Sequence, residues 1–166
     1  MEVREIVEGD WPQILALNEA SVSQLSELDR RRLEWIVSLS DRSVAIDDEG
    51  RIVAFAIALT ADTGYDSRNY RWFDSHFDRF YYLDRVVVAE PFRRRGLATR
   101  LYDLMEAEAA ARFGRMVCDV GCAPPNEASL AFHAARGYSQ LTRLRYGGEK
   151  VVALLCREFE PLGAAS

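Results

Sequence analysis

Histidine and cysteine are scarce in this sequence, whose 166 residues include two histidines and three cysteines. Cys118 and Cys122 are separated by three residues, and no second cysteine or histidine pair completes a set of zinc ligands. We therefore expect no metal site. An odd number of cysteines in strand-like surroundings indicates buried, reduced thiols, which are typical of a reducing compartment such as the cytoplasm.

Long apolar runs and an excess of basic charge are also missing. No segment approaches the about 20 apolar residues of a membrane-spanning helix. The first residues, Met1 to Glu5, carry acids and lack the apolar core of a signal peptide. The formal net charge of −5 argues against a nucleic-acid-binding protein. With 49% hydrophobic and 28% charged residues, the composition predicts one globular domain over residues 1–166.

Hydrophobic patterning and turn residues predict a mixed α/β order of elements. Asp10 is expected to cap a first helix whose apolar stripe is Ile14, Leu15, Leu17 and Val22. The remaining expected elements are a helix at 29–39, strands at 43–46 and 51–59, a strand at 83–89, a helix at 96–113, a strand at 116–121, a helix from Asn126 to Gly137, and a strand pair at 139–146 and 150–157. The strand–helix–strand passage in the middle predicts one parallel pair in a mainly antiparallel sheet.

The most informative stretch runs from Val86 to Leu101. A β-branched run stops at Pro91, a basic loop with one glycine follows, and an amphipathic helix begins. A strand end, a turn with inward N–H groups and the positive end of a helix dipole together form a phosphate cradle. Gly96 and Ala98 let a pyrophosphate approach the backbone, and the preceding arginines can add charge-assisted hydrogen bonds. The alternative is an ordinary solvated turn.

Two motifs in register resemble the GNAT superfamily, the Gcn5-related N-acetyltransferases. The run Arg93-Arg94-Arg95-Gly96-Leu97-Ala98 is similar to the family's pyrophosphate loop, Gln/Arg-x-x-Gly-x-Gly/Ala. The run Asn126–Tyr138 is similar to its late helix, where asparagine is followed by an aromatic pair and then glycine–aromatic. The resemblance implies a mixed, mainly antiparallel sheet of about six or seven strands with a central parallel pair, flanked by helices on both faces.

The resemblance also implies an activity: transfer of an acetyl group from acetyl-CoA to a primary amine, by direct attack in a ternary complex. Backbone N–H groups of the loop would hold the pyrophosphate, the strand backbone before it would pair with the pantetheine arm, and an N–H near Val86 would polarise the thioester carbonyl. Asn126 matches the family's asparagine at the arm, and a plain helix cap is its alternative. The implied cofactor-binding residues are Val86, Val87, Val88, Arg93, Arg94, Arg95, Gly96, Leu97, Ala98, Thr99, Asn126, Ser129 and His133.

The catalytic residues implied are His133 and Asp84. His133 stands where many family members carry a tyrosine that protonates the departing thiolate, and a histidine can donate that proton or merely pack near the arm. Asp84 shares strand parity with Val86 and Val88, so it is a candidate general base, with an ion pair to Arg85 or to the insertion at 61–82 as its alternative.

Other sequence features leave alternatives open. Asp119 and Tyr82 are rival bases, and the family also uses water relays. A non-catalytic acyl-CoA-binding or sensor module is the alternative function. Homodimers are common in the family, and the residues neither indicate nor exclude one.

The segment 61–82 interrupts the regular pattern. It contains eight of the 18 aromatic residues, interleaved with acids and arginines. A connection of this length is often a lid, and the alternative is a partly helical insertion that packs its own aromatic residues. Because it precedes the strand that would carry the thioester, we predict that it forms one wall of the amine pocket.

Overall fold

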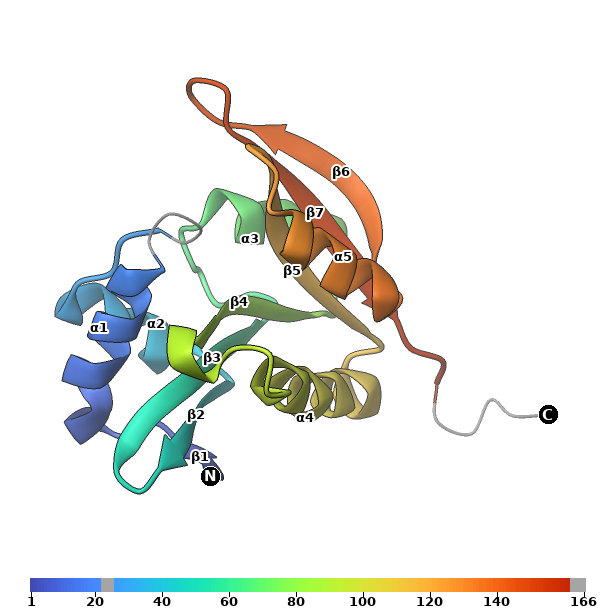
Figure 1. Cartoon of the computed structure of the whole chain (residues 1–166). Helices are drawn as coiled ribbons and strands as arrows, with labels where there is room; N and C mark the ends of the chain where they lie inside the picture. Colours follow the sequence, from blue (N-terminus) through green and yellow to red (C-terminus); the bar gives the residue numbers. More distant parts are fainter. Residues whose placement is uncertain (22–25, 162–166) are drawn as a thin grey trace. The chain divides into compact units, whose positions relative to one another are not determined.

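Helices and strands follow one another in the order that hydrophobic patterning predicts, with an additional strand at Glu2–Glu5 and a helix at Arg68–His76 (Figure 1). The computed structural model describes residues 1–21 and 26–161, so Val22 lies outside the described residues. The elements are β1 (Glu2–Glu5), η1 (Glu8–Asp10), α1 (Trp11–Ala20), α2 (Arg30–Leu39), β2 (Arg42–Asp48), β3 (Arg51–Thr60), α3 (Arg68–His76), β4 (Tyr81–Val88), η2 (Glu90–Phe92), α4 (Leu97–Arg112), β5 (Arg115–Ala123), α5 (Glu127–Ala135), β6 (Ser139–Arg145) and β7 (Val151–Glu158).

The seven strands are hydrogen-bonded in the order β1-β2-β3-β4-β5-β7-β6. The β1–β2, β2–β3, β5–β7 and β6–β7 ladders are antiparallel. β4 and β5 run parallel, with Tyr81 opposite Met116 and Tyr82 opposite Val117. The predicted fold class, a mostly antiparallel sheet with one parallel pair and flanking helices, is therefore confirmed. β1 is a strand that the sequence analysis did not predict.

Contacts divide the chain into two compact units, which we describe separately. Unit 1 comprises Met1–Leu59 and Leu83–Met105, and unit 2 comprises Thr60–Tyr82 and Glu106–Ser166. The core of unit 1 centres on β3, where every residue from Ile52 to Leu59 is buried. Side chains alternate between the faces of a strand, so both faces of β3 are covered, as its alternating alanines predict. The helices of unit 1 add Ile14, Leu33, Ile36, Leu97, Leu101 and Met105 to this core.

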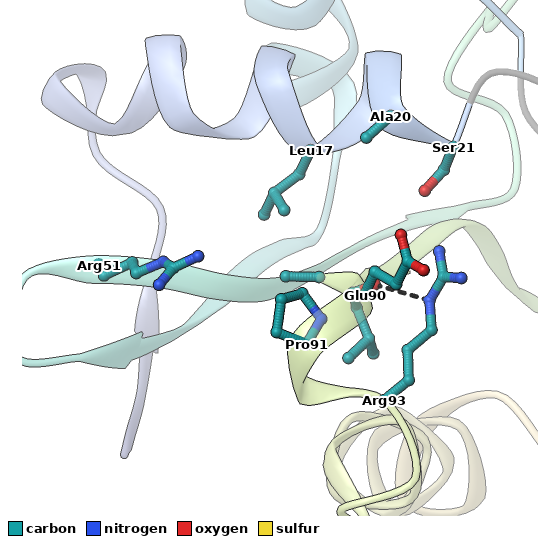
Figure 2. Close-up of a pocket in the computed structure, with 9 residues that line it drawn as sticks. Leu17, Ala20, Ser21, Arg51, Glu90, Pro91 and Arg93 are labelled. Atoms are coloured by element: carbon teal, nitrogen blue, oxygen red, sulfur yellow. Dashed lines mark hydrogen bonds between the residues drawn. The ribbon is translucent and has the colours of Figure 1, made fainter.

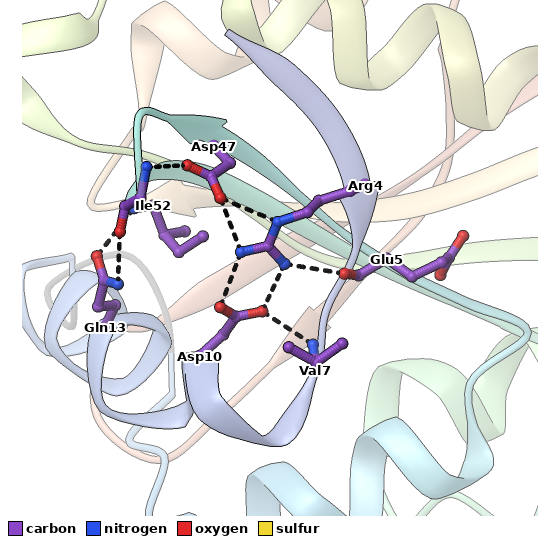
Figure 3. Close-up of polar contacts among 8 residues, drawn as sticks. Arg4, Glu5, Val7, Asp10, Gln13, Asp47 and Ile52 are labelled. Carbon is purple, nitrogen blue, oxygen red and sulfur yellow. Dashed lines mark hydrogen bonds and ion pairs between the residues drawn. The ribbon is translucent and has the colours of Figure 1, made fainter.

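An ion-pair network ties β1 to the start of α1 and to the end of β2 (Figure 3). The Arg4 guanidinium donates to both carboxylate oxygens of Asp10, at 2.8 and 2.9 Å, and its Nε donates to Asp47 at 3.0 Å. Asp10 also accepts a hydrogen bond from the Val7 N–H at 2.8 Å. Asp10 does stand at the N-cap position of α1, but its side chain makes no cap hydrogen bond. The prediction that the Asp10 side chain caps α1 is therefore wrong, because its carboxylate accepts hydrogen bonds from Arg4 and from the Val7 N–H instead.

Asp10 gives unit 1 a pH-dependent contribution to stability. Hydrogen bonding from Arg4 lowers the pKa of this carboxyl below its ordinary value. A carboxyl with a lowered folded-state pKa stabilises the fold above its unfolded pKa of about 4, and that contribution is lost as pH falls through the folded pKa. We expect Asp10→Asn to cost about 1–2 kcal/mol at pH 7 and less at pH 3, because the unfolded carboxyl is then mostly protonated and part of the contribution is lost. Urea unfolding of both proteins at the two pH values measures this, and an equal cost at both would contradict it.

Aromatic rings form the core of unit 2 around α3. Tyr70 packs edge-on against Tyr65 and Tyr82, with ring centroids 5.5 Å apart in both pairs, and against Phe80 at 5.7 Å. All four rings are buried, and the Tyr70 hydroxyl donates to the Thr60 carbonyl at 2.7 Å. The segment 61–82 is therefore a helical insertion that packs its own aromatic residues, the second of the two interpretations. Its role as a wall of the amine pocket stays a prediction.

The buried carboxylate of Glu106 links three elements of unit 2. Glu106 of α4 is 6% exposed and accepts both ends of the Arg136 guanidinium, at 3.0 and 2.6 Å. Arg157 of β7 donates to the same carboxylate at 2.8 Å, and the Tyr138 hydroxyl at 2.9 Å. Glu106 therefore joins α4 to the end of α5 and to β7 by charge-assisted hydrogen bonds, the stronger kind.

The cysteines are free thiols. Cys118 and Cys156 are buried, and burial raises the pKa of both, that of Cys156 to about 12. This confirms the expected burial of these two thiols, whereas Cys122 is only half-buried.

Candidate functional site

The loop between β4 and α4 has the backbone of an anion-binding turn. Arg94 and Gly96 both adopt left-handed conformations, with φ of 62° and 79°. Such turns direct successive N–H groups into one concavity, which favours an anion. The first helical hydrogen bond of α4 runs from the Arg100 N–H to the Gly96 carbonyl at 3.0 Å. The N–H groups of the first turn, from Leu97 to Thr99, therefore have no acceptor within the helix and lie at the positive end of its dipole.

The three loop arginines are exposed, and two of them have defined contacts. The Arg93 Nε donates to the Val88 carbonyl at 3.3 Å, which anchors the loop to the end of β4. The Arg95 guanidinium lies over the Phe92 ring at 5.1 Å, and Arg51 of β3 lies over the same ring at 5.3 Å. The loop thus combines fixed backbone donors with a high density of positive charge.

A pocket of about 240 Å³ lies beside this loop within unit 1 (Figure 2). Leu17 and Ala20 face it from α1, and Ser21 lies at the end of that helix. Glu90 and Arg93 lie next to each other on the opposite side. The remaining lining residues are Arg51, Val88, Ala89 and Pro91. The lining combines apolar side chains with one acid and two arginines.

The faces of β4 alternate as the sequence predicts. Val86 and Val88 are half-buried like Asp84, whereas Arg85 and Val87 between them are buried. Asp84 therefore shares a face with Val86 and Val88. Its carboxylate forms an ion pair with the Arg85 Nε at 3.2 Å, which is the alternative to a catalytic role that the sequence analysis named for Asp84.

Sequence reasoning missed the structural role of Arg85. Its guanidinium donates to the Asn18 amide oxygen at 2.8 Å and to the Ser26 carbonyl at 2.9 Å, which ties β4 to the α1–α2 connection. Strand parity places Arg85 on the same face as Leu83, Val87 and Ala89, and a lone arginine among apolar residues is the signal that could have found it.

In unit 2, the predicted site residues of α5 run from its N-cap to its last turn. The Asn126 side chain accepts a hydrogen bond from the Ser129 N–H at 3.3 Å, so Asn126 is the N-cap of α5. The two N–H donors of its amide are not needed for this cap. His133 lies one turn after Ser129, is 4% exposed, and packs edge-on against Tyr138 with centroids 5.2 Å apart.

The hydrogen bond of His133 fixes its tautomer. Nδ1 lies 2.6 Å from the Ser129 carbonyl oxygen, which can only accept, so Nδ1 carries a proton. Burial lowers the pKa of this imidazole, and the backbone hydrogen bond only partly opposes that shift. At neutral pH the ring is therefore mainly neutral, with Nε2 as an acceptor. A proton for a leaving group would be available only from the imidazolium form.

The rival base candidates Tyr82 and Asp119 contact each other directly. The Tyr82 hydroxyl donates to the Asp119 carboxylate at 2.6 Å. The two residues are 37 positions apart in the sequence, and the parallel pairing of β4 with β5 brings them together. Tyr82 is buried and Asp119 is half-buried.

Among residues 1–21 and 26–161, no group of three or more histidine, cysteine, aspartate or glutamate side chains could hold a metal ion. No helix in the same residues is long and apolar enough to cross a bilayer.

Comparison with known proteins identifies one family model. The model of the acetyltransferase (GNAT) family matches residues 2–138. No curated protein sequence matches the chain significantly.

Solved structures of acetyltransferases share the fold at low sequence identity. A ribosomal-protein-alanine N-acetyltransferase from Brucella melitensis is 20% identical with a TM-score of 0.70, covering 96% of this chain and 100% of that one. The ribosomal-protein-S18-alanine N-acetyltransferase from Escherichia coli is 14% identical with a TM-score of 0.71, covering 99% and 97%. Naa20 from Chaetomium thermophilum, in complex with a bisubstrate analogue, is 19% identical with a TM-score of 0.75, covering 96% and 87%.

Proposed function

The chain belongs to the acetyltransferase (GNAT) family, and from this premise we propose that it transfers the acetyl group of acetyl-CoA to a primary amine by direct attack in a ternary complex. The observation that carries the proposal is the loop of residues 93–99, in which two left-handed residues precede the N-terminus of α4. Acetyl-CoA supplies an activated acyl group on a thiol that leaves readily. The protein has to bind that cofactor, orient it and remove a proton from the amine.

The loop fits the diphosphate of the cofactor. Backbone N–H groups from Arg94 to Thr99 can donate to its oxygens, and Gly96 places no side chain between them and the ligand. Arg93, Arg94 and Arg95 add positive charge, as the exposed end of an anion site requires. We assign the diphosphate to these residues.

The arm of the cofactor is assigned to β4 and α5. Val86, Val87 and Val88 would pair with the pantetheine amides through their backbone, and the N–H near Val86 would donate to the thioester oxygen. The free amide donors of Asn126, with Ser129 beside it, would contact the arm. The side chains of the strand can pack while its backbone binds, so neither role excludes the other.

His133 provides a prediction about the departing thiolate. We expect His133→Phe to lower kcat while the Kd for acetyl-CoA stays nearly unchanged, and His133→Tyr to retain activity. Because proton donation needs the imidazolium and burial lowers its pKa, wild-type kcat should fall as pH rises through that lowered pKa. The His133→Tyr variant should lack this fall. Normal turnover by His133→Phe would make His133 a packing residue.

Two-substrate kinetics test the order of the reaction. Initial rates measured at several concentrations of acetyl-CoA and of an accepted amine should give intersecting double-reciprocal lines, because both substrates must be bound before transfer. Parallel lines would indicate an acylated enzyme and would contradict direct attack. Cys122, the half-buried thiol, supplies the control, since Cys122→Ala should leave the pattern unchanged.

A further inference from the structure

The pocket beside the diphosphate loop is not used by the acetyl transfer proposed above. We propose that it binds a free α-amino acid with an apolar side chain, and that this ligand weakens the binding of acetyl-CoA. All residues that line the pocket belong to unit 1, so the site is complete within one compact unit (Figure 2). The binding of the amino acid stands on the pocket alone, whereas its effect on acetyl-CoA rests on the proposed function.

A carboxylate and a guanidinium lie next to each other in the lining. The Arg93 N–H donates to the Glu90 carbonyl at 3.2 Å, and the Glu90 carboxylate points toward Ser21, where α1 ends (Figure 2). Neither charge has an ion-pair partner among the described residues. Glu90 and the negative C-terminal pole of α1 favour an ammonium group, and Arg93 favours a carboxylate.

A free α-amino acid carries both of these groups on a single carbon. One such ligand can therefore place its ammonium at Glu90 and its carboxylate at Arg93. A simple amine would bring its charge close to Arg93, and a simple carboxylic acid would bring its charge close to Glu90, so each would meet a charge of its own sign. The zwitterion avoids both repulsions.

The rest of the lining suits a small apolar side chain. Leu17 and Ala20 face the pocket from α1, and Pro91 lies across from them (Figure 2). Burial of hydrocarbon against such residues is favourable in proportion to the area removed from water. The volume of about 240 Å³ is below the roughly 300–1,000 Å³ of pockets for drug-sized ligands, so the ligand has to be small. The remaining cation, Arg51, lies over the Phe92 ring at 5.3 Å.

The place of the pocket along β4 separates it from the acyl group of the cofactor. It borders Val88, the last residue of the strand, and the residues that follow, whereas the thioester oxygen is assigned to the N–H near Val86. Two residues of a strand span about 6–7 Å. An ammonium held at Glu90, beyond the end of the strand, is therefore not placed at the acyl carbon. The amino acid is thus an effector, and its own amine is not the acceptor.

Arg93 belongs both to the pocket and to the diphosphate loop. A guanidinium that holds the carboxylate of the amino acid contributes less positive charge to the diphosphate, so the two ligands oppose each other. Each ligand raises the Kd of the other by the same factor, as thermodynamic linkage requires. We expect a factor of about five, at the lower end of typical couplings, because Arg93 is exposed and Arg94 and Arg95 still face the diphosphate.

Calorimetric titration of the protein with leucine, in the absence of acetyl-CoA, tests the binding. Leucine should bind at least about tenfold more tightly than each of three analogues that lack one of its groups. N-acetylleucine lacks the ammonium, leucinamide lacks the carboxylate, and glycine lacks the side chain. No binding of leucine, or binding of any one analogue as tight as that of leucine, would overturn the proposal.

Two variants with matched controls locate leucine in this pocket. Glu90→Gln removes the charge that holds the ammonium, and Ala20→Leu adds bulk where Ala20 faces the pocket. Each should weaken leucine binding by about tenfold and keep the wild-type Kd for acetyl-CoA measured without leucine. Glu19→Gln and Ala16→Leu alter exposed residues of α1 that do not line the pocket and should bind leucine as the wild type does. Unchanged leucine affinity in Glu90→Gln or in Ala20→Leu would contradict the proposed site.

Titration of acetyl-CoA in the presence of saturating leucine tests the effector role. The Kd of acetyl-CoA should rise about fivefold in the wild type, and Glu90→Gln should lose this rise at the same leucine concentration. An unchanged Kd would overturn the effector role, and formation of N-acetylleucine would make the pocket the acceptor site instead. Failure of the proposed function is distinguishable, because leucine would then still bind while no amine supports thiol release from acetyl-CoA.

Discussion

Replacement of Gly96 by valine should weaken acetyl-CoA binding by about 10- to 100-fold and leave the protein folded. Gly96 has a φ of +79°, a conformation that costs a β-branched residue about 1–3 kcal/mol. A Cβ at this position would meet no atom within 4 Å, so the effect comes from the backbone and not from a clash. Valine relieves the strain by turning the loop, which moves N–H donors away from the diphosphate. Each lost charge-assisted hydrogen bond is worth about 1.5–3 kcal/mol, or roughly tenfold or more in affinity.

The chain contains a closely matched control for this change. Gly114, at the end of α4, has the same φ of +79° and the same open space around its Cβ position. Gly114→Val should therefore lose similar thermal stability while its acetyl-CoA affinity stays that of the wild type. Calorimetric titration of both variants separates backbone strain from ligand contact. Equal acetyl-CoA affinities of the two variants would show that the loop does not bind the diphosphate.

Glu106→Gln should be the most destabilising single change among those considered. The carboxylate is buried and receives two guanidinium groups and one phenol, so its removal leaves Arg136 and Arg157 without their anion. Breaking a buried pair costs about 3–5 kcal/mol. The side chains of Arg136 and Arg157 are 16% and 34% exposed, which favours the lower end of that range. At roughly 2–4 °C per kcal/mol for a chain of this size, we expect Tm to fall by about 6–12 °C.

Glu108 lies two residues further along the same helix and serves as the comparison. It pairs with Arg112 at 3.1 Å, but the two side chains are 31% and 45% exposed. Exposed pairs one helical turn apart contribute about 0.3–0.5 kcal/mol, so Glu108→Gln should change Tm by at most about 2 °C. Thermal unfolding by circular dichroism measures both variants. Similar losses from Glu106→Gln and Glu108→Gln would contradict the account of the buried network.

Local sequence chemistry was sufficient to predict the turn between β4 and α4. A β-branched strand, a proline, a glycine and a following amphipathic helix each restrict the backbone within a few residues, so this turn is specified by its own residues. The same holds for Asn126, whose helix cap is formed by its own neighbours. The alternation of alanine with larger apolar residues from Val53 to Ala58 predicted a strand covered on both faces. A two-residue period can be recognised in the strand's own sequence, without knowing which elements pack against it.

The remaining features depend on contacts between distant residues. Asp10 satisfies the sequence rule for a helix cap, yet a guanidinium on the preceding strand binds its carboxylate more strongly than the helix N–H groups do. The pair of Tyr82 and Asp119 depends on the register between β4 and β5, which no local pattern specifies. The aromatic residues of 61–82 fit a lid and a self-packed insertion equally well in the sequence, and the packing around Tyr70 supports the insertion.

The most direct test of acetyl transfer is thiol release from acetyl-CoA by the purified protein across a library of primary amines, including small amines and peptides with free N-termini. The account predicts that at least one amine raises the rate of thiol release well above the rate without amine. Mass spectrometry should find that amine acetylated in equal amount. Tight binding of acetyl-CoA with no amine-dependent release across the library would contradict the account and would favour a non-catalytic acyl-CoA sensor.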